Sequence, residues 1–308
     1  MNRMTSVAIK VSLAALCILV FGYSSWADDF IYANNYNFGG LDNIWQIDLT
    51  SGNIITNQYS VATGNGRGVV DVNNVLYITT ANSGQVFAFN TSTSVLSTAF
   101  TVSGASGLAS ISYNGTNFWI GDYSGSNKAF LYSPSGTLLQ TIALANCTGF
   151  CDGLTYIPLN GGELISNRAD GFDQNSIYDI YSASNGALLQ SAFIDTTSLA
   201  SLGCNHTTGI AWDGTNYFVS CLDTGSLPNG SLAEYNASGT FLGLDNLSNS
   251  NSSVFNNNGL GAAMEGLSAN FAVTIPTPEP GTLFMMGTGL LALACGRKWL
   301  LAHGRFSS

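Results

Sequence analysis

The chain has 308 residues, of which 18 are acidic, 8 are basic and 2 are histidine, giving a formal net charge of −10. Charged residues make up only 8% of the sequence, against ~25% in ordinary soluble domains, so most of the surface must be uncharged. Basic residues are outnumbered by acidic ones, which excludes a nucleic-acid-binding face. The shortage of charged helix-forming residues excludes a coiled coil or helical bundle. Aromatic residues, at 11%, are numerous enough for a buried core, which argues against a disordered acidic chain.

Residues 1–27 have the pattern of a secretory signal peptide. Two basic residues precede the apolar run 11–22, and small residues follow it. Signal peptidase is expected to cut after Ala27, which leaves Asp28 as the first residue of the mature protein. The alternative is an uncleaved N-terminal anchor, which is disfavoured because a helix of this run spans ~18 Å of a ~30 Å hydrocarbon layer.

The body, residues 28–274, is expected to be one all-β domain built from repeats. Four segments share one order of elements, and they are 68–102, 107–144, 153–194 and 209–244. Each begins with a glycine before an aliphatic residue and continues with two aromatic-rich strands, a Ser/Asn-Gly turn and an aliphatic strand. Four-stranded units that recur at ~40–55 residues predict a β-propeller.

The two ends of the body are expected to complete one blade together. Residues 30–61 supply only three strands, and residues 264–269 supply the missing first strand. Such a closure covers the edges that an open sheet would expose, and it gives five blades. Six blades remain open if 245–261 contains strands, although its Asn- and Ser-rich sequence is more typical of a surface loop.

The body is strongly acidic and has few cations. It contains 17 acidic residues and only Arg67, Lys128 and Arg168 as basic ones, a formal net charge of −14. This balance disfavours anionic partners such as nucleic acid and suits neutral or polyhydroxy surroundings. His206 is the only histidine of the body, and no G-x-S-x-G motif accompanies it, so we predict no catalytic residue.

Cleavage of a glycan by paired carboxylates remains the alternative function. This chemistry needs only two carboxyl groups ~5–10 Å apart in a cleft, and a propeller can present them at its centre. The eligible carboxylates are Asp122, Asp152, Glu163, Asp170, Asp213 and Glu265.

A cation-containing loop is the one candidate ligand site of the body. Arg168, Asp170 and Asp173 can grip a ligand there, or they form an ordinary ion pair at a loop tip. Asp170, Asp173 and Asp179 do not have the spacing of an EF-hand, so no calcium site is predicted. Several aromatic residues can stack on sugars, but on strands they more often fill the space between blades. They are Tyr32, Tyr36, Trp45, Phe118, Trp119, Trp212 and Tyr217.

Export implies an oxidising compartment for the four cysteines of the body. Three pairings are open, and the spacing favours Cys147 with Cys151 and Cys204 with Cys221. A metal site that uses His206 is the alternative, which is disfavoured because there is no second histidine and no C-x2-C pair. We therefore predict no metal and no cofactor.

The tail, residues 275–308, has three parts in a fixed order. Pro278-Glu279-Pro280 comes first, the uncharged run 281–296 follows, and a short basic cluster comes last. This order resembles the PEP-CTERM sorting signal of Gram-negative bacteria that make extracellular polysaccharide. The resemblance covers about thirty residues, and its specificity comes from all three parts occurring together behind a signal peptide.

The resemblance implies a route and a set of partners. Pro278, Glu279 and Pro280 would be recognised by an exosortase after signal peptidase has acted, and a transmembrane helix would hold the tail in the inner membrane until it is removed. The protein would then reach the cell envelope, the cell surface or the extracellular matrix. The alternative is a plain C-terminal anchor. We therefore expect a non-enzymatic binding or structural component of extracellular polysaccharide, without nucleic-acid partners.

Overall fold

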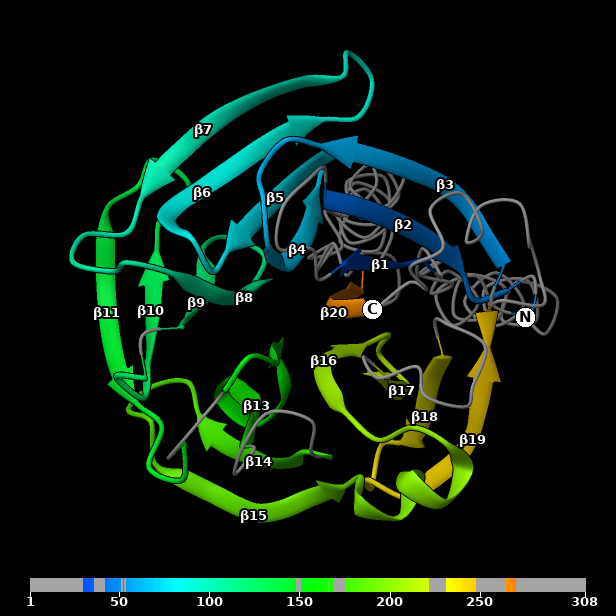
Figure 1. The fold of residues 1–308 in the computed structure, drawn as a ribbon. Coiled ribbons are helices and arrows are strands. Elements are labelled where there is room, and N and C mark those ends of the chain that lie inside the picture. The colour runs from blue at the N-terminus through cyan, green and yellow to red at the C-terminus, as the bar shows by residue number, and fades with distance from the viewer. Residues whose placement is uncertain are drawn as a thin grey trace, which may run out of the picture. The chain divides into compact units, whose positions relative to one another are not determined.

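Five four-stranded antiparallel sheets surround one axis in the computed structural model, which forms a five-bladed β-propeller (Figure 1). The structure describes residues 30–35, 42–50, 52, 54–123, 125–147, 151–168, 175–221, 231–247 and 264–269. The prediction of an all-β, five-bladed fold is thereby confirmed. The predicted signal helix, the predicted membrane helix and most of the Asn- and Ser-rich stretch lie outside the described residues.

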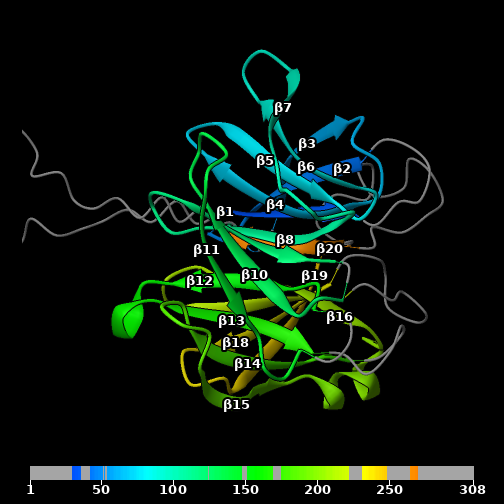
Figure 2. The same ribbon diagram turned by 90° about the vertical axis from the view of Figure 1, so that its left-hand side faces the viewer.

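In blades 2 to 5 the strands run outward from the axis in chain order (Figures 1 and 2). Blade 2 contains β4 (Gly66–Val72), β5 (Val75–Thr80), β6 (Ser83–Asn90) and β7 (Val95–Thr101). Blade 3 contains β8 (Leu108–Tyr113), β9 (Phe118–Asp122), β10 (Lys128–Tyr132) and β11 (Leu138–Ala143). Blade 4 contains β12 (Leu154–Ile157), β13 (Glu163–Arg168), β14 (Ile177–Ser182) and β15 (Leu188–Asp195). Blade 5 contains β16 (Thr207–Trp212), β17 (Asn216–Cys221), β18 (Ser231–Asn236) and β19 (Phe241–Asn246).

Blade 1 joins the two ends of the body, as predicted. Its innermost strand is β20 (Met264–Ala269), and its outer strands are β1 (Phe30–Asn35), β2 (Asp42–Asp48) and β3 (Ile54–Val61). β20 pairs antiparallel with β1, so that Ala33 lies opposite Leu267. Because the last strand hydrogen-bonds to the first, no blade lacks its inner strand.

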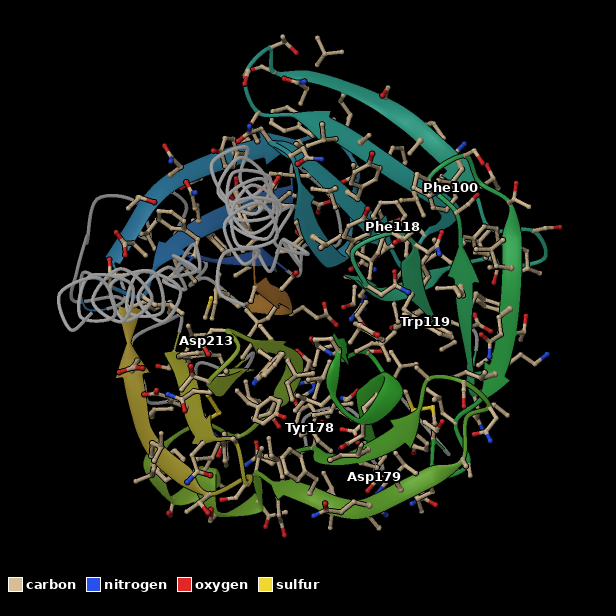
Figure 3. The ribbon with its side chains drawn as sticks, turned by 180° about the vertical axis from the view of Figure 1, so that it is seen from behind. Phe100, Phe118, Trp119, Tyr178, Asp179 and Asp213 are labelled. Atoms are coloured by element: carbon tan, nitrogen blue, oxygen red, sulfur yellow. A yellow bond between two sulfur atoms is a disulfide. The ribbon has the colours of Figure 1, made fainter. Side chains whose placement is uncertain are left out.

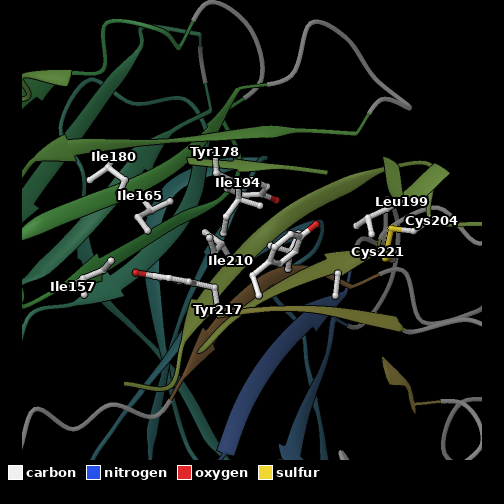
Figure 4. Close-up of a cluster of buried hydrophobic side chains, with 13 residues drawn as sticks. Ile157, Ile165, Tyr178, Ile180, Ile194, Leu199, Cys204, Ile210, Tyr217 and Cys221 are labelled. Atoms are coloured by element: carbon white, nitrogen blue, oxygen red, sulfur yellow. A yellow bond between two sulfur atoms is a disulfide. The ribbon is translucent and has the colours of Figure 1, made fainter. Parts of the chain in front are cut away.

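The hydrophobic core lies between neighbouring blades. Ile165 and Tyr178 of blade 4 pack with Ile210 and Tyr217 of blade 5, and all four are buried (Figure 4). Aromatic side chains fill the space between blades 2 and 3, where the ring centroids of Phe100 and Phe118 lie 6.0 Å apart (Figure 3). Alternation along each strand therefore buries one set of side chains against each neighbouring blade.

The hairpin between the third and fourth strands of a blade packs on the outer strand of the preceding blade. Gly136, Gly186 and Gly239 occupy these turns with φ between +76° and +82°. A Cβ on Gly136 would lie 2.6 Å from the Cβ of Phe100, and one on Gly186 would lie 2.5 Å from the carbonyl oxygen of Ala143. Glycine is thus needed for two reasons: the turn has a positive φ, and its backbone lies too close to the preceding blade for a Cβ to fit.

Replacing Gly186 by alanine is expected to lower the free energy of unfolding by about 2–3 kcal/mol, since it adds a clash with backbone to the cost of positive φ. Gly125 is the matched control, because its φ is +78° and no atom lies within 4 Å of its would-be Cβ. Gly125→Ala should cost only about 1 kcal/mol. Urea unfolding midpoints measure both values, and equal losses in the two variants would contradict the packing of this turn.

Candidate functional site

The innermost strands carry a repeated tripeptide in which glycine stands between a variable residue and an aliphatic one. Four copies are Arg67-Gly68-Val69, Asp152-Gly153-Leu154, Thr208-Gly209-Ile210 and Glu265-Gly266-Leu267, and a fifth, Ser106-Gly107-Leu108, leads into β8. A Cβ on Gly209 would lie 2.6 Å from the backbone nitrogen of Leu267, in the neighbouring blade. The glycines therefore let the backbones of adjacent inner strands touch around the axis.

Polar side chains of blades 4 and 5 bind the backbone at this ring. The hydroxyl of Tyr178 donates to the carbonyl oxygen of Thr208 at 2.8 Å. The hydroxyls of Thr208 and Ser220 donate to the carbonyl oxygen of Glu265 at 2.9 and 3.1 Å. These bonds satisfy carbonyl groups that would otherwise be buried without a partner at the axis.

The variable residues of three blades meet in one ionic cluster. Arg67 of β4 forms an ion pair with Glu265 of β20 in blade 1. Its Nη1 also lies 3.5 Å from Oδ2 of Asp152, two blades away in the other direction around the ring. Nη2 donates to the hydroxyl of Tyr123 at 3.0 Å, and the guanidinium carbon lies 4.4 Å from the centre of that ring. We call Arg67, Tyr123, Asp152 and Glu265 the axial cluster.

The axial cluster is shielded from solvent. Arg67, Asp152 and Glu265 are 2%, 5% and 1% exposed. Burial raises the pKa of Asp152 above its ordinary value, and the charge of Arg67 opposes that rise. Two carboxylates thus share one guanidinium in a nearly dry environment, which ties three blades together and leaves little of either carboxylate open to a substrate.

The structure therefore brings two of the candidate carboxylates together, as glycan cleavage would require, but both are buried. Of the six candidates, Asp152 and Glu265 lie at the same guanidinium. Asp213 instead accepts hydrogen bonds from the backbone of its own turn, at 2.7 Å from the nitrogens of Thr215 and Asn216. Glu163 accepts from the side chain of Asn160 at 2.7 Å, and Asp122 from that of Ser126.

The candidate ligand loop is described only in part, because Asp170 and Asp173 lie outside the described residues. Arg168 ends β13, and its Nε lies 3.0 Å from Oδ2 of the buried Asp179 on the next strand. Asp179 also accepts from the backbone nitrogen of Ala192 at 2.7 Å. Arg168 is thus committed to an ion pair within blade 4.

Both favoured cysteine pairs lie at disulfide distance. The Cα atoms of Cys147 and Cys151 are 5.9 Å apart, and those of Cys204 and Cys221 are 5.5 Å apart. His206 is buried beside Thr207 at the start of β16. Within the described part of the chain, no group of three or more His, Cys, Asp or Glu side chains is arranged to hold a metal ion.

Most of the aromatic candidates are core residues. Tyr32, Trp45, Phe118, Trp119 and Tyr217 are at most 4% exposed. Trp212 is the exception, since it ends β16 and is half-buried. Tyr36 lies outside the described residues, as do Ala27, Asp28, Pro278, Glu279 and Pro280. No helix among the described residues is both long enough and apolar enough to cross a membrane.

The fold and the charge pattern define a five-bladed β-propeller with a buried ionic cluster between its inner strands. Residues 276–298 match the PEP-CTERM protein-sorting motif. The chain thus carries a five-bladed propeller in front of a PEP-CTERM motif, which implies export, processing by an exosortase and sorting to the envelope or surface.

No curated protein matches the chain in sequence. Among solved structures, it is similar to a protein of unknown function from Bacteroides caccae, with a TM-score of 0.47 and 8% identity over 78% of this chain and 97% of that one. It is also similar to a chain of a nidogen/laminin complex, with a TM-score of 0.49 and 10% identity over 79% and 98%. The computationally designed Ika8 protein aligns with a TM-score of 0.38 and 11% identity over 68% of this chain and 60% of that one. These likenesses are distant.

Proposed function

We propose that the protein is a non-enzymatic binding or structural component of the extracellular polysaccharide of a Gram-negative bacterium. Signal peptidase would release it at Ala27 and Asp28, the tail would hold it in the inner membrane transiently, and an exosortase would act at Pro278-Glu279-Pro280. The sorting motif at residues 276–298 is the observation that supports this route.

The chemistry of the body supports a neutral, hydrated setting. Its surface must be largely uncharged, and the three cations of residues 28–274 are too few for an anionic partner. Arg67 and Arg168 are moreover held in ion pairs with buried carboxylates. A binding role needs no reactive group, whereas a glycan-cleaving role would need the shielded Asp152 and Glu265 to reach a sugar.

The route is tested in the producing cells with Glu279→Gln, which removes the only charge of the Pro-Glu-Pro segment. We expect the wild-type protein in the polysaccharide fraction and the variant in the inner membrane with residues 281–308 retained. Mass spectrometry of the C-terminus measures this. The matched control is Glu234→Gln on β18, which keeps an acceptor for the side chain of Asn216, 2.6 Å away. A wild-type protein that keeps residues 281–308 would exclude cleavage.

Measuring the viscosity of a polysaccharide solution distinguishes the binding role from the enzyme alternative, because cleavage of the chains lowers it. The purified protein should leave the viscosity of the isolated polysaccharide constant over hours. A fall in viscosity that Asp152→Asn abolishes would establish cleavage and overturn the non-enzymatic role.

A further inference from the structure

Three aromatic side chains are partly exposed where inner strands end. Tyr113 and Trp212 are the last residues of β8 and β16, and Tyr156 is the last but one of β12. All three are half-buried, in contrast to the buried rings of the core. We call the end of the propeller where these strands finish the hairpin face, because short turns lead from each of them into the second strand of its blade.

The three rings are held in place by the core beneath them. The ring of Tyr113 lies 5.0 Å from that of Phe118, and the ring of Trp212 lies 6.3 Å from that of Tyr217, with an angle of 28° between the two planes. The side chain of Tyr156 packs against the buried cluster that contains Trp119, Leu154 and Leu164. Its backbone nitrogen donates to the hydroxyl of Ser112 at 2.9 Å, so Tyr156 and Tyr113 start from adjoining strands. Rings fixed in this way lose little conformational entropy when a ligand stacks on them.

The turns after Tyr113 and Trp212 are polar, the turn after Tyr156 contains the exposed Leu159, and none of the three carries a cation. Residues 114–117 and 213–216 read Asn-Gly-Thr-Asn and Asp-Gly-Thr-Asn, and the Asp213 carboxylate bonds to its own turn. Lys128 begins β10 and Arg168 ends β13, both at the other end of their blades. Within the described residues the hairpin face therefore offers aromatic faces, amides and hydroxyls, but no ammonium or guanidinium group.

We propose that Tyr113, Tyr156 and Trp212 form a binding site for a neutral polysaccharide chain. The apolar faces of pyranose rings would stack on the aromatic rings, and the sugar hydroxyls would bond to the turn amides. Because the described part of this face carries no cation, it disfavours anionic polysaccharides, which would need positively charged partners. This site rests on the proposed function and specifies its ligand class and location.

The test is native affinity electrophoresis of the full chain, purified in detergent, through gels that contain dextran, galactomannan or the anionic polysaccharide alginate. We expect retardation by at least one neutral polysaccharide and none by alginate. Trp212→Ala and Tyr113→Ala should each weaken binding about 3- to 10-fold, the range that loss of one aromatic contact gives. Trp212→Phe and Tyr113→Phe should retain most of it.

The matched control is Phe241→Ala, which removes a ring that is 37% exposed on the outer strand β19 and should leave retardation unchanged. A second measurement needs no variant: the neutral polysaccharide should protect Trp212 of the wild type from oxidation by N-bromosuccinimide, read by peptide mass spectrometry. Retardation that persists in both alanine variants, with Trp212 unprotected, would overturn this site and leave the proposed binding role standing. If neither neutral polysaccharide retards the wild type, the site and the proposed binding role both fail, and retardation by alginate alone would overturn the ligand class.

Discussion

Replacing Gly266 by alanine is expected to lower the free energy of unfolding by about 3 kcal/mol, one of the two largest effects of a single substitution in this protein. A Cβ at this position would lie 2.8 Å from the Cα of Gly68 and would overlap the carbonyl oxygen of Arg67. Both neighbours are backbone atoms of an inner strand, so no side chain can swing aside. The clash can be relieved only by moving β20 away from β4.

Gly243 on β19 is the matched control for this substitution. It also lies in a strand, but no atom lies within 4 Å of its would-be Cβ. Gly243→Ala should change stability by less than about 0.5 kcal/mol or raise it slightly. Urea unfolding of both variants makes the comparison, and a Gly266→Ala protein as stable as Gly243→Ala would contradict the close contact of the inner strands.

Replacing Arg67 by methionine is expected to cost about 3–5 kcal/mol at neutral pH, because it leaves two buried carboxylates without their shared cation. Lys128→Met is the control, since it removes the same charge from an exposed side chain and should cost less than about 0.5 kcal/mol. The triple variant Arg67→Met, Asp152→Asn, Glu265→Gln should recover much of the loss, because no unpaired charge then remains buried. Equal stability of Arg67→Met and Lys128→Met would contradict the axial cluster.

The Arg67→Met defect should depend on pH in a defined direction. Burial already raises the pKa of Asp152 above its ordinary value of 3.8, and Arg67 opposes that rise. Without Arg67 the folded-state pKa rises further, so the folded protein holds a proton that the unfolded chain has released. Stability of the variant should therefore be highest below about pH 4 and fall as the pH rises through the raised pKa. Unfolding curves at several pH values check this, and a defect that does not change with pH would exclude a buried charge as its cause.

The sequence was informative about the fold because the repeats carry local signals. Period-2 alternation and Gly-containing turns placed the strands, and the unmatched segments 30–61 and 264–269 showed how the ring closes. Both features depend on short stretches of chain, so they can be read without knowledge of long-range contacts. The structure bears them out in blade 1, where β20 pairs with β1.

The axial cluster could not be predicted in the same way. Asp152 and Glu265 are only two of six eligible carboxylates, and the sequence favours Arg168, in an acidic loop, over Arg67 as a ligand-binding cation. A signal was present, since Arg67, Asp152 and Glu265 each precede the glycine of an inner strand. Which side chains cross the axis depends on how far neighbouring strands are rotated relative to one another. The contact of Arg67 with Asp152, two blades away, is set by the tertiary structure, and no local pattern in the sequence shows it.

The exposed aromatic residues were missed for a related reason. Most of the aromatic candidates proved to be core, and only Trp212 of those described reaches the surface. Tyr113 and Tyr156 have the same residue type and the same strand context as buried tyrosines. They are exposed because they lie at the ends of β8 and β12. Only the register of the sheets shows where these strands end.

The pairing of β20 with β1 has a consequence for the order of biosynthesis. The partner residues Ala33 and Leu267 are separated by most of the body, so the nascent chain cannot close its ring until nearly all of it has been made. Until then β1 keeps an unpaired inner edge, and the chain stays short of its final cooperative state. We therefore expect the ring to gain its full stability only once β20 has been made and has paired with β1.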